Sequence, residues 1–217
     1  MEGKEYRIIY DDEYLMVVDK PAGMLVIPTP KKEKNTLTDL LNRELDKRGV
    51  EANAHPCHRI DRETSGLIIY AKGKKMQAMM MDEFKNRAVK KSYIAFVHGT
   101  VKEKFGVIDN AIFNPNKGRK ESAQTKFTVV GRHKDFTVVE AVPVTGRLNQ
   151  IRIHMKRLGH PLVGESVFAF RKDFKLKFKR DALHASYLRF KHPATGEAVE
   201  FKSPLPEDMQ MLLQNQN

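Results

Sequence analysis

Short strand-like segments separated by proline, glycine and charged turns recur along this sequence and restrict the folds that are open to it. Tyr6 to Tyr10 and Leu15 to Val18 read as strands joined by the turn Asp11-Asp12-Glu13. Lys20-Pro21-Ala22-Gly23 then interrupts the pattern, because proline and glycine break regular structure, and Met24 to Ile27 reads as another strand. Many short strands with few helices favour an α+β fold over a regular βαβ series.

The remaining elements follow from the spacing of apolar residues. Leu37, Leu41 and Leu45 fall on one helical face, and Met76 and Met80 do so further along the chain. Helices are therefore expected over residues 36–48, 74–86, 150–158 and 206–213. Strands are expected over residues 67–70, 91–97, 126–130, 136–144, 184–190 and 198–201. Without an internal repeat or an obvious linker, residues 1–217 are expected to form one domain.

The composition restricts the compartment and the partner. The 217 residues carry a formal net charge of +12, and a chain this basic usually meets a polyanion such as nucleic acid. Cys57 is the one cysteine, which fits a reducing compartment. No apolar run reaches the ~20 residues that span a membrane, and no signal peptide precedes the first strand. We therefore expect a cytoplasmic monomer without a membrane contact.

The segment from His58 to Gly66 joins charged side chains to the aliphatic run Leu67 to Tyr70. Asp61 stands between Arg59 and Arg62 beside this apolar run. Nearby cations favour the ionised form of an acid whereas burial opposes it, and functional sites collect such conflicts. Taken alone, however, Asp61 is better explained as a capping residue or a salt-bridged loop residue.

Two further segments combine with this one. They are Lys91-Ser92-Tyr93 and the stretch from Thr145 to His154, which contains Arg147 and Arg152. These residues, in this order, resemble the pseudouridine synthases of the RluA type, which isomerise uridine within RNA. The resemblance also covers Asp19-Lys20-Pro21-Ala22-Gly23 near the start and Leu183-His184-Ala185 with His192-Pro193 near the end. Several spaced motifs in one order are more specific than a single match.

The resemblance implies a mixed, largely antiparallel sheet with flanking helices and a central RNA-binding cleft. It implies that Asp61 is the essential acid, that Arg152 pairs with it, and that Tyr93 stacks on the flipped uracil. Arg59 would help to fill the gap left by the extruded base. The isomerisation needs no redox cofactor, ATP or metal, and the RNA would be a tRNA, a 23S-type rRNA or both.

The sequence departs from the family pattern at three positions. Asn149 stands where the family usually has histidine, Glu165 where it has aspartate, and Phe168 where tyrosine is usual. These changes put the substrate in doubt more than the reaction. The separate N-terminal S4 RNA-binding domain of many relatives is also expected to be absent.

Basic side chains outside the catalytic motif are expected to contact RNA phosphates. Lys117, Arg119 and Lys120 lie in what reads as an exposed loop, and Arg62 and Arg147 flank the motifs. The stretch from Arg171 to Arg180 alternates lysines with apolar residues, which would place the lysines on one face of a strand. Phosphate contacts of this kind supply affinity without reading sequence.

Other interpretations stay open at this point. The charge fits a non-catalytic RNA-binding or ribosome-assembly module equally well. A hydrolase would need a second carboxylate or a metal, and Glu63 is the nearest acid to Asp61. Histidine pairs such as His55 and His58 match no zinc spacing, and no metal site is expected.

Overall fold

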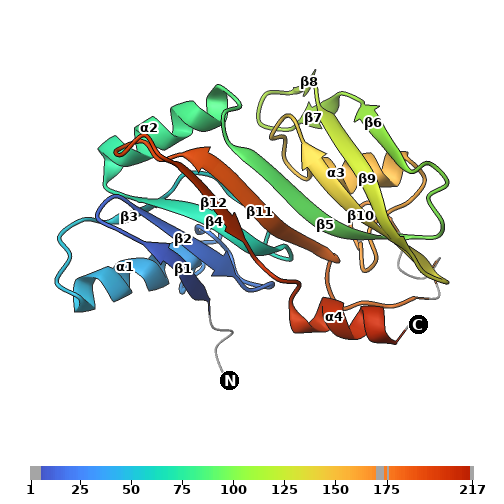
Figure 1. Ribbon diagram of the computed structural model, residues 1–217, viewed down its shortest axis with the longest axis horizontal. Coiled ribbons are helices and arrows are strands. Elements are labelled where there is room, and N and C mark those ends of the chain that lie inside the picture. The colour runs from blue at the N-terminus through green and yellow to red at the C-terminus, as the bar shows by residue number, and fades with distance from the viewer. Residues whose placement is uncertain (1–5, 170–173, 175, 216–217) are drawn as a thin grey trace. The chain divides into compact units, whose positions relative to one another are not determined.

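The computed structural model describes residues 6–169, 174 and 176–215, and these divide into two compact units. Unit 1 comprises residues 1–90 and 187–203, and unit 2 comprises residues 91–186 and 204–217, each within the described ranges. Strand β11 (Leu183–Lys191) begins in unit 2 and ends in unit 1 (Figure 1). The expectation of one domain over residues 1–217 stays a prediction.

Unit 1 is a set of antiparallel strands with two helices. Its sheet has the order β1–β2–β4–β11, with β3 beside β4 and β12 beside β11. The strands are β1 (Arg7–Asp11), β2 (Leu15–Lys20), β3 (Ala54–Pro56), β4 (Ser65–Lys72) and β12 (Ala198–Lys202). The helices are α1 (Leu37–Lys47) and α2 (Lys74–Lys85).

The core of unit 1 lies between β2, β4 and α2. Val17 and Ile69 are fully buried, and Met80 of α2 packs against them. Leu188 and Phe190 of β11 complete the same cluster. Met76 and Met80 of α2 are therefore core residues, whereas Met79 of the same helix is exposed.

The start of α1 explains why Met24 to Ile27 is not a strand, which corrects the prediction. Thr36 and Asp39 form a reciprocal capping box at this helix end. The carbonyl groups of Leu25 and Val26 accept from the backbone N–H groups of Leu37 and Thr38, at 2.8 and 3.1 Å. The segment therefore satisfies orphan donors of a helix N-terminus instead of pairing with a strand.

Unit 2 is built on an antiparallel sheet. Its order is β11–β5–β10–β9–β6, and β7 and β8 form a separate two-stranded pair. The strands are β5 (Lys90–His98), β6 (Phe105–Asp109), β7 (Ile112–Asn114), β8 (Arg119–Glu121), β9 (Gln124–Arg132) and β10 (Phe136–Pro143). The helices are α3 (Gln150–Arg157) and α4 (Glu207–Gln214).

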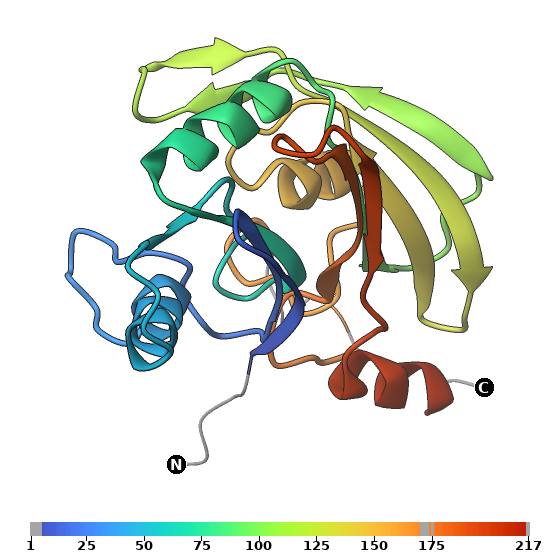
Figure 2. The same cartoon turned by 60° about the vertical axis from the view of Figure 1, so that its left-hand side comes forward.

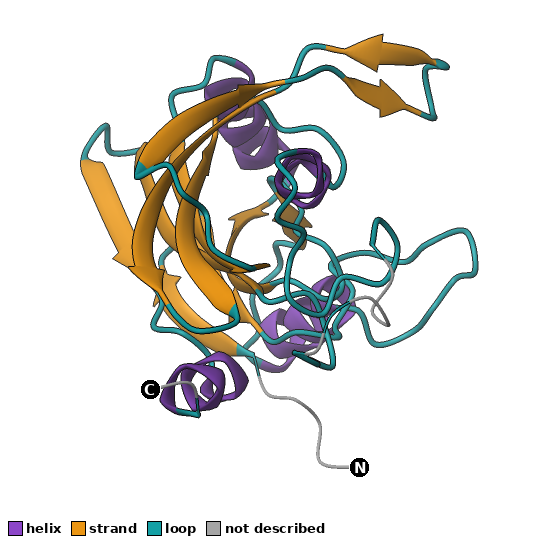
Figure 3. Ribbon diagram, turned by 90° about the vertical axis from the view of Figure 1, so that its right-hand side faces the viewer, coloured by secondary structure: helices purple, strands orange, loops and turns teal. Residues whose placement is uncertain are grey.

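The core of unit 2 gathers buried side chains from β5, β10 and α4. Phe96 and Phe136 stack with their ring centroids 5.1 Å apart, and Met209 of α4 is buried in the same cluster. Helix α3 packs on one face of β9 and β10 (Figure 2). The pair β7–β8 extends away from β9 and β10 (Figure 3).

The predicted class, an α+β fold with a mixed, largely antiparallel sheet and flanking helices, is confirmed. The predicted strand over residues 171–180 is not: residues 170–173 and 175 lie outside the described residues, and residues 176–180 form no strand. Strands β3, β6, β7 and β8 were not predicted. They are three to five residues long, and β3 (Ala54–Pro56) and β8 (Arg119–Glu121) contain no large apolar side chain, so no apolar alternation marks these two in the sequence.

A buried histidine in unit 2 gives the fold a predicted sensitivity to acid. The ring of His98 stacks on Phe174 with 3.9 Å between centroids, and burial together with the charge of Lys177 lowers the pKa of His98 to about 4. An unfolded histidine takes up its proton near pH 6.5. The neutral His98 ring therefore contributes its full share to the free energy of unfolding above about pH 6.5. This share is lost as the pH falls from about 6.5 towards about 4.

We expect the free energy of unfolding to fall by up to about 2 kcal/mol between pH 7.5 and pH 5 from this group. Thermal denaturation followed by circular dichroism across this range measures the effect. The variant His98→Phe keeps a planar ring against Phe174 and should show a shallower pH dependence. His55→Gln in unit 1 is the matched control. An unchanged slope in His98→Phe would contradict the assignment.

Candidate active site

Asp61 lies in the loop between β3 and β4 of unit 1. The preceding residue, Ile60, is buried, and the Asp61 side chain is half-buried. The carbonyl group of Asp61 accepts from the backbone N–H of Thr64 at 3.1 Å, which closes a turn before β4 begins. The loop therefore holds the half-buried Asp61 next to the buried Ile60 and shortly before the buried strand β4.

A buried lysine fixes this loop. Lys20 is fully buried at the end of β2, and its Nζ donates to the carbonyl groups of Pro21 and Met24 at 2.9 Å and of Arg62 at 3.2 Å. The backbone N–H of Gly23 donates to the same Arg62 carbonyl at 2.7 Å. A buried ammonium needs such partners. Lys20 therefore ties the Pro21–Met24 turn to the residue that follows Asp61.

The residues next to Asp61 are of two kinds: the exposed arginines and a histidine that contacts the rest of unit 1. Arg59 and Arg62 are both exposed, and Arg62 Nε donates to the Gly23 carbonyl at 3.1 Å. His58 Nε2 accepts from the backbone N–H of Ile69 at 3.1 Å, and its ring lies 4.7 Å from the ring of Phe84. His58 therefore serves the fold of the loop.

Tyr93 occupies strand β5 of unit 2. It is 8% exposed and stands opposite Ala141 of β10 in the antiparallel register. A position inside a strand holds the ring more rigidly than a loop would. Its predicted stacking on uracil stays a prediction.

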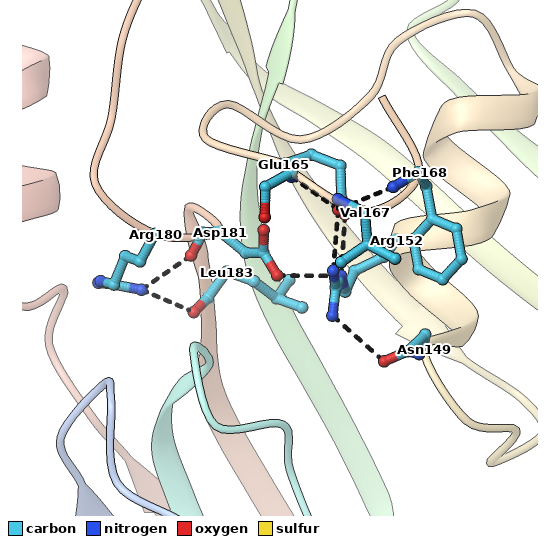
Figure 4. A network of polar contacts seen from close by, with 9 residues as sticks. Asn149, Arg152, Glu165, Val167, Phe168, Arg180, Asp181 and Leu183 are labelled. Carbon is cyan, nitrogen blue, oxygen red and sulfur yellow. Dashed lines mark hydrogen bonds and ion pairs between the residues drawn. The ribbon is translucent and has the colours of Figure 1, made fainter. Parts of the chain in front are cut away.

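Arg152 lies in the first turn of α3 and is held by two buried carboxylates of unit 2 (Figure 4). Its Nε and Nη2 donate to the two carboxylate oxygens of Glu165, each at 2.8 Å. Its Nε also lies 2.9 Å from Asp181 Oδ2. This bidentate arrangement fixes the plane of the guanidinium. The expected pair of Arg152 with Asp61 stays a prediction.

Glu165 stays ionised despite its burial. Burial alone would raise the pKa of Glu165, but Arg152 and the backbone N–H groups of Val167 and Phe168 outweigh it and lower this pKa below its ordinary value. Glu165 Oε1 accepts from these two N–H groups at 2.7 and 3.1 Å. The carboxylate therefore organises both Arg152 and the turn that follows it.

The three departures from the family pattern meet at Arg152. Asn149 Oδ1 accepts from Arg152 Nη1 at 3.3 Å, Glu165 forms the bidentate pair, and the Phe168 ring centroid lies 5.1 Å from the guanidinium carbon (Figure 4). The sequence could not show that these positions share a partner. All three departures from the family pattern therefore change the surroundings of the same side chain, Arg152.

A directional hydrogen-bond chain holds the segment before Arg152. Gln150 Oε1 accepts from Thr145 Oγ1 at 2.6 Å, and Gln150 Nε2 donates to Thr125 Oγ1 at 3.0 Å. Thr125 Oγ1 lies 2.9 Å from His154 Nδ1, and His154 Nε2 lies 2.9 Å from the carbonyl oxygen of Asn110. Since a carbonyl only accepts, Nε2 carries the proton. Burial lowers the pKa of His154, which keeps the ring neutral.

The predicted RNA-contacting cations of unit 2 gather at the pair β7–β8. Lys117, Arg119 and Lys120 are exposed on or beside β8. Arg147 approaches the same place, because its Nε donates to the carbonyl group of Ser122 at 3.0 Å. The segment read as an exposed loop is thus a turn leading into a strand, with its cations on the surface.

Within residues 6–169, 174 and 176–215, no group of three His, Cys, Asp or Glu side chains lies close enough to hold a metal ion. None of the helices in these same ranges has the length and apolar character needed to cross a membrane.

Comparison with known proteins identifies the family. The sequence model of the family described as RNA pseudouridylate synthase matches residues 14–157. The chain belongs to the RNA pseudouridylate synthase family. It is therefore an isomerase, and its match is to the RluA branch of pseudouridine synthases. The matched range contains Asp61, Tyr93 and Arg152.

Curated pseudouridine synthases align along nearly the whole chain. The Bacillus subtilis protein named uncharacterized RNA pseudouridine synthase YlyB is 40% identical over 99% of this chain and 74% of its own length. The Zymomonas mobilis protein named ribosomal large subunit pseudouridine synthase D is 35% identical over 94% of this chain and 71% of its own length.

A solved structure shares the fold. Human RNA pseudouridylate synthase domain containing 4 superimposes with a TM-score of 0.80 at 23% identity, covering 95% of this chain and 91% of that one. The predicted pseudouridine synthase fold is thereby confirmed. The predicted central RNA-binding cleft stays a prediction.

Proposed function

We propose that this pseudouridine synthase isomerises specific uridines in large-subunit ribosomal RNA. The observation that carries the proposal is the similarity, along nearly the whole chain, to relatives named ribosomal large subunit pseudouridine synthase D. The net charge of +12 supports an RNA substrate, because cationic side chains supply the phosphate contacts on which RNA affinity depends. Transfer RNA, the other substrate considered from the sequence, is an outcome of the test.

In the proposed reaction the N1–C1′ bond of uridine breaks and a C5–C1′ bond forms. The proton at C5 leaves, and N1, which carries no proton in uridine, takes up a proton in the product. Asp61 supplies the carboxylate, whether it attacks C1′ or C6 or promotes elimination at the sugar. The half-buried setting of Asp61, beside the buried Ile60 and shortly before the buried strand β4, supports this role, because the isomerisation must exclude water.

The other site residues take supporting roles in this proposal. Tyr93 stacks on the extruded uracil, Arg152 is the cationic partner of the catalytic carboxylate, and Arg59 helps to fill the gap in the RNA stack. The exposed cations Arg62, Lys117 and Arg119, with Lys120 and Arg147, contact phosphates. Lys20 holds the backbone of the residue that follows Asp61, and Glu165 holds the guanidinium of Arg152. These contacts support a preorganised site, because they restrict the loop of Asp61 and the side chain of Arg152.

The test uses transcripts of large-subunit rRNA and of tRNA that carry tritium at C5 of uridine. Isomerisation should release tritium to water from the rRNA transcript, and pseudouridine mapping of total RNA from wild-type and deletion cells should locate the position. Release from tRNA alone would move the substrate to that class. Absence of release from both would favour the non-catalytic RNA-binding module, and free uracil would favour a hydrolase.

A further inference from the structure

Glu121, at the end of β8, accepts from three side chains of unit 2. Its Oε1 lies 2.8 Å from Lys117 Nζ, and its Oε2 lies 2.8 Å from Asn114 Nδ2 and 3.4 Å from Arg147 Nη1. The Glu121 side chain is 11% exposed, whereas those of Lys117 and Arg147 are 54% and 33% exposed. The carboxylate therefore lies beneath the cations that cover it.

Glu121 is an acid among the cations that are proposed to contact RNA. Lys117, Arg119 and Lys120 precede Glu121 in the sequence, and Arg147 reaches it from the segment before α3. Carboxylate and phosphate oxygens accept from the same ammonium and guanidinium donors. Glu121 thus holds two of the donors that a phosphate of the RNA backbone would use.

We propose that Glu121 is a specificity-determining residue whose carboxylate competes with RNA phosphates for Lys117 and Arg147. RNA that binds only through its phosphates must displace the Glu121 carboxylate from Lys117 and Arg147. RNA that also makes contacts elsewhere on the enzyme gains binding energy that offsets this cost. The inference deepens the proposed function and rests on it, since it assumes that these cations meet RNA.

The geometry indicates which contact of Glu121 an RNA phosphate would replace first. Arg147 is anchored through its Nε to the carbonyl group of Ser122, so the guanidinium stays in place while its Nη groups change partner. Its 3.4 Å contact with Glu121 is the longest of the three. Hydrogen bonds from Asn114 and Lys117 lower the pKa of Glu121 to about 2. The competitor therefore stays charged throughout the neutral range, and salt rather than pH controls the competition.

The experiment measures binding of an unstructured oligoadenylate of about 20 nucleotides, long enough to reach several cations at single-strand spacing. Glu121→Gln removes the charge and keeps the size and an acceptor for Asn114. We expect its log–log salt dependence to steepen by about 0.7, the value for one more neutralised phosphate, which is about fivefold tighter binding at 0.1 M salt. Glu103→Gln, an exposed acid of the same unit, is the matched control and should gain less.

Glu121→Ser, which also removes the hydrogen bonds, should show a gain in the same direction. A gain in Glu121→Gln no larger than that of the control would overturn the inference. Weaker binding by both Glu121 variants would overturn it too, because the carboxylate would then organise the hairpin instead of competing. Oligoadenylate contains no uridine, so this outcome is independent of isomerisation. If no tritium were released from natural RNA, the proposed function would be refuted. The oligoadenylate binding result could still be interpreted.

Discussion

Replacing Asp61 with asparagine is expected to lower the rate of pseudouridine formation by at least about 10⁴-fold, as loss of a nucleophile does in other enzymes. Asparagine keeps the size of the side chain and removes its negative charge. The loop itself should survive, because its hydrogen bonds from Thr64 and Lys20 go to the backbone carbonyl groups of Asp61 and Arg62. The loss should therefore be chemical rather than structural.

Tritium release under single-turnover conditions measures this effect, with circular dichroism as the check on folding. Glu63→Gln is the matched control, because it removes the nearest other acid in the sequence. That variant should retain activity near the wild-type level. Full release by Asp61→Asn would remove Asp61 from the chemistry, and an equal loss in both variants would point to a site with two carboxylates.

The second large effect is on stability. Arg152→Ala is expected to reduce the free energy of unfolding by about 3–5 kcal/mol, because it removes the cation that pairs with the buried carboxylates of Glu165 and Asp181. The side chains of these two acids are only 1% and 3% exposed. For a chain of this size such a loss lowers the melting temperature on the order of 10 °C.

Urea unfolding followed by circular dichroism measures this loss. The matched control is Arg157→Ala on the same helix. The exposed side chain of Arg157 donates to the carbonyl group of Ala111 at 2.8 Å, and its removal should lower the free energy of unfolding by about 1 kcal/mol. A double variant with Arg152→Ala and Glu165→Gln should recover part of the stability, since it removes one unpaired charge. Equal losses in the two single variants would show that burial of the acids does not decide the effect.

The sequence was sufficient to predict the elements whose apolar spacing is regular. The leucines of α1 and the methionines of α2 fixed those helices to within about one or two residues, the usual uncertainty of a helix boundary. The segment Met24 to Ile27 has the composition of a strand, but its carbonyl groups bond to α1 instead. Local composition carries no information about such a tertiary partner.

The candidate site was predictable in its residue types and not in its contacts. Asp61, Tyr93 and Arg152 stood out through their motifs. Lys20 did not stand out as a buried residue, because lysine is almost never fully buried unless it is paired. The pair of Arg152 with Glu165 spans 13 positions and depends on how the chain returns after α3. Contacts of this kind come from the fold and not from local sequence patterns.

The path of β11 has a consequence for synthesis of the protein. Leu188 and Phe190 complete the core that Val17 and Ile69 begin, and Met209 does the same for Phe96 and Phe136. Both cores therefore close with residues that come later in the sequence than the rest of the same core. Until then the nascent chain exposes aliphatic and aromatic faces, which are the surfaces that chaperones recognise and that aggregate when unprotected. Folding of each unit therefore waits for a segment that is synthesised well after the rest of its core.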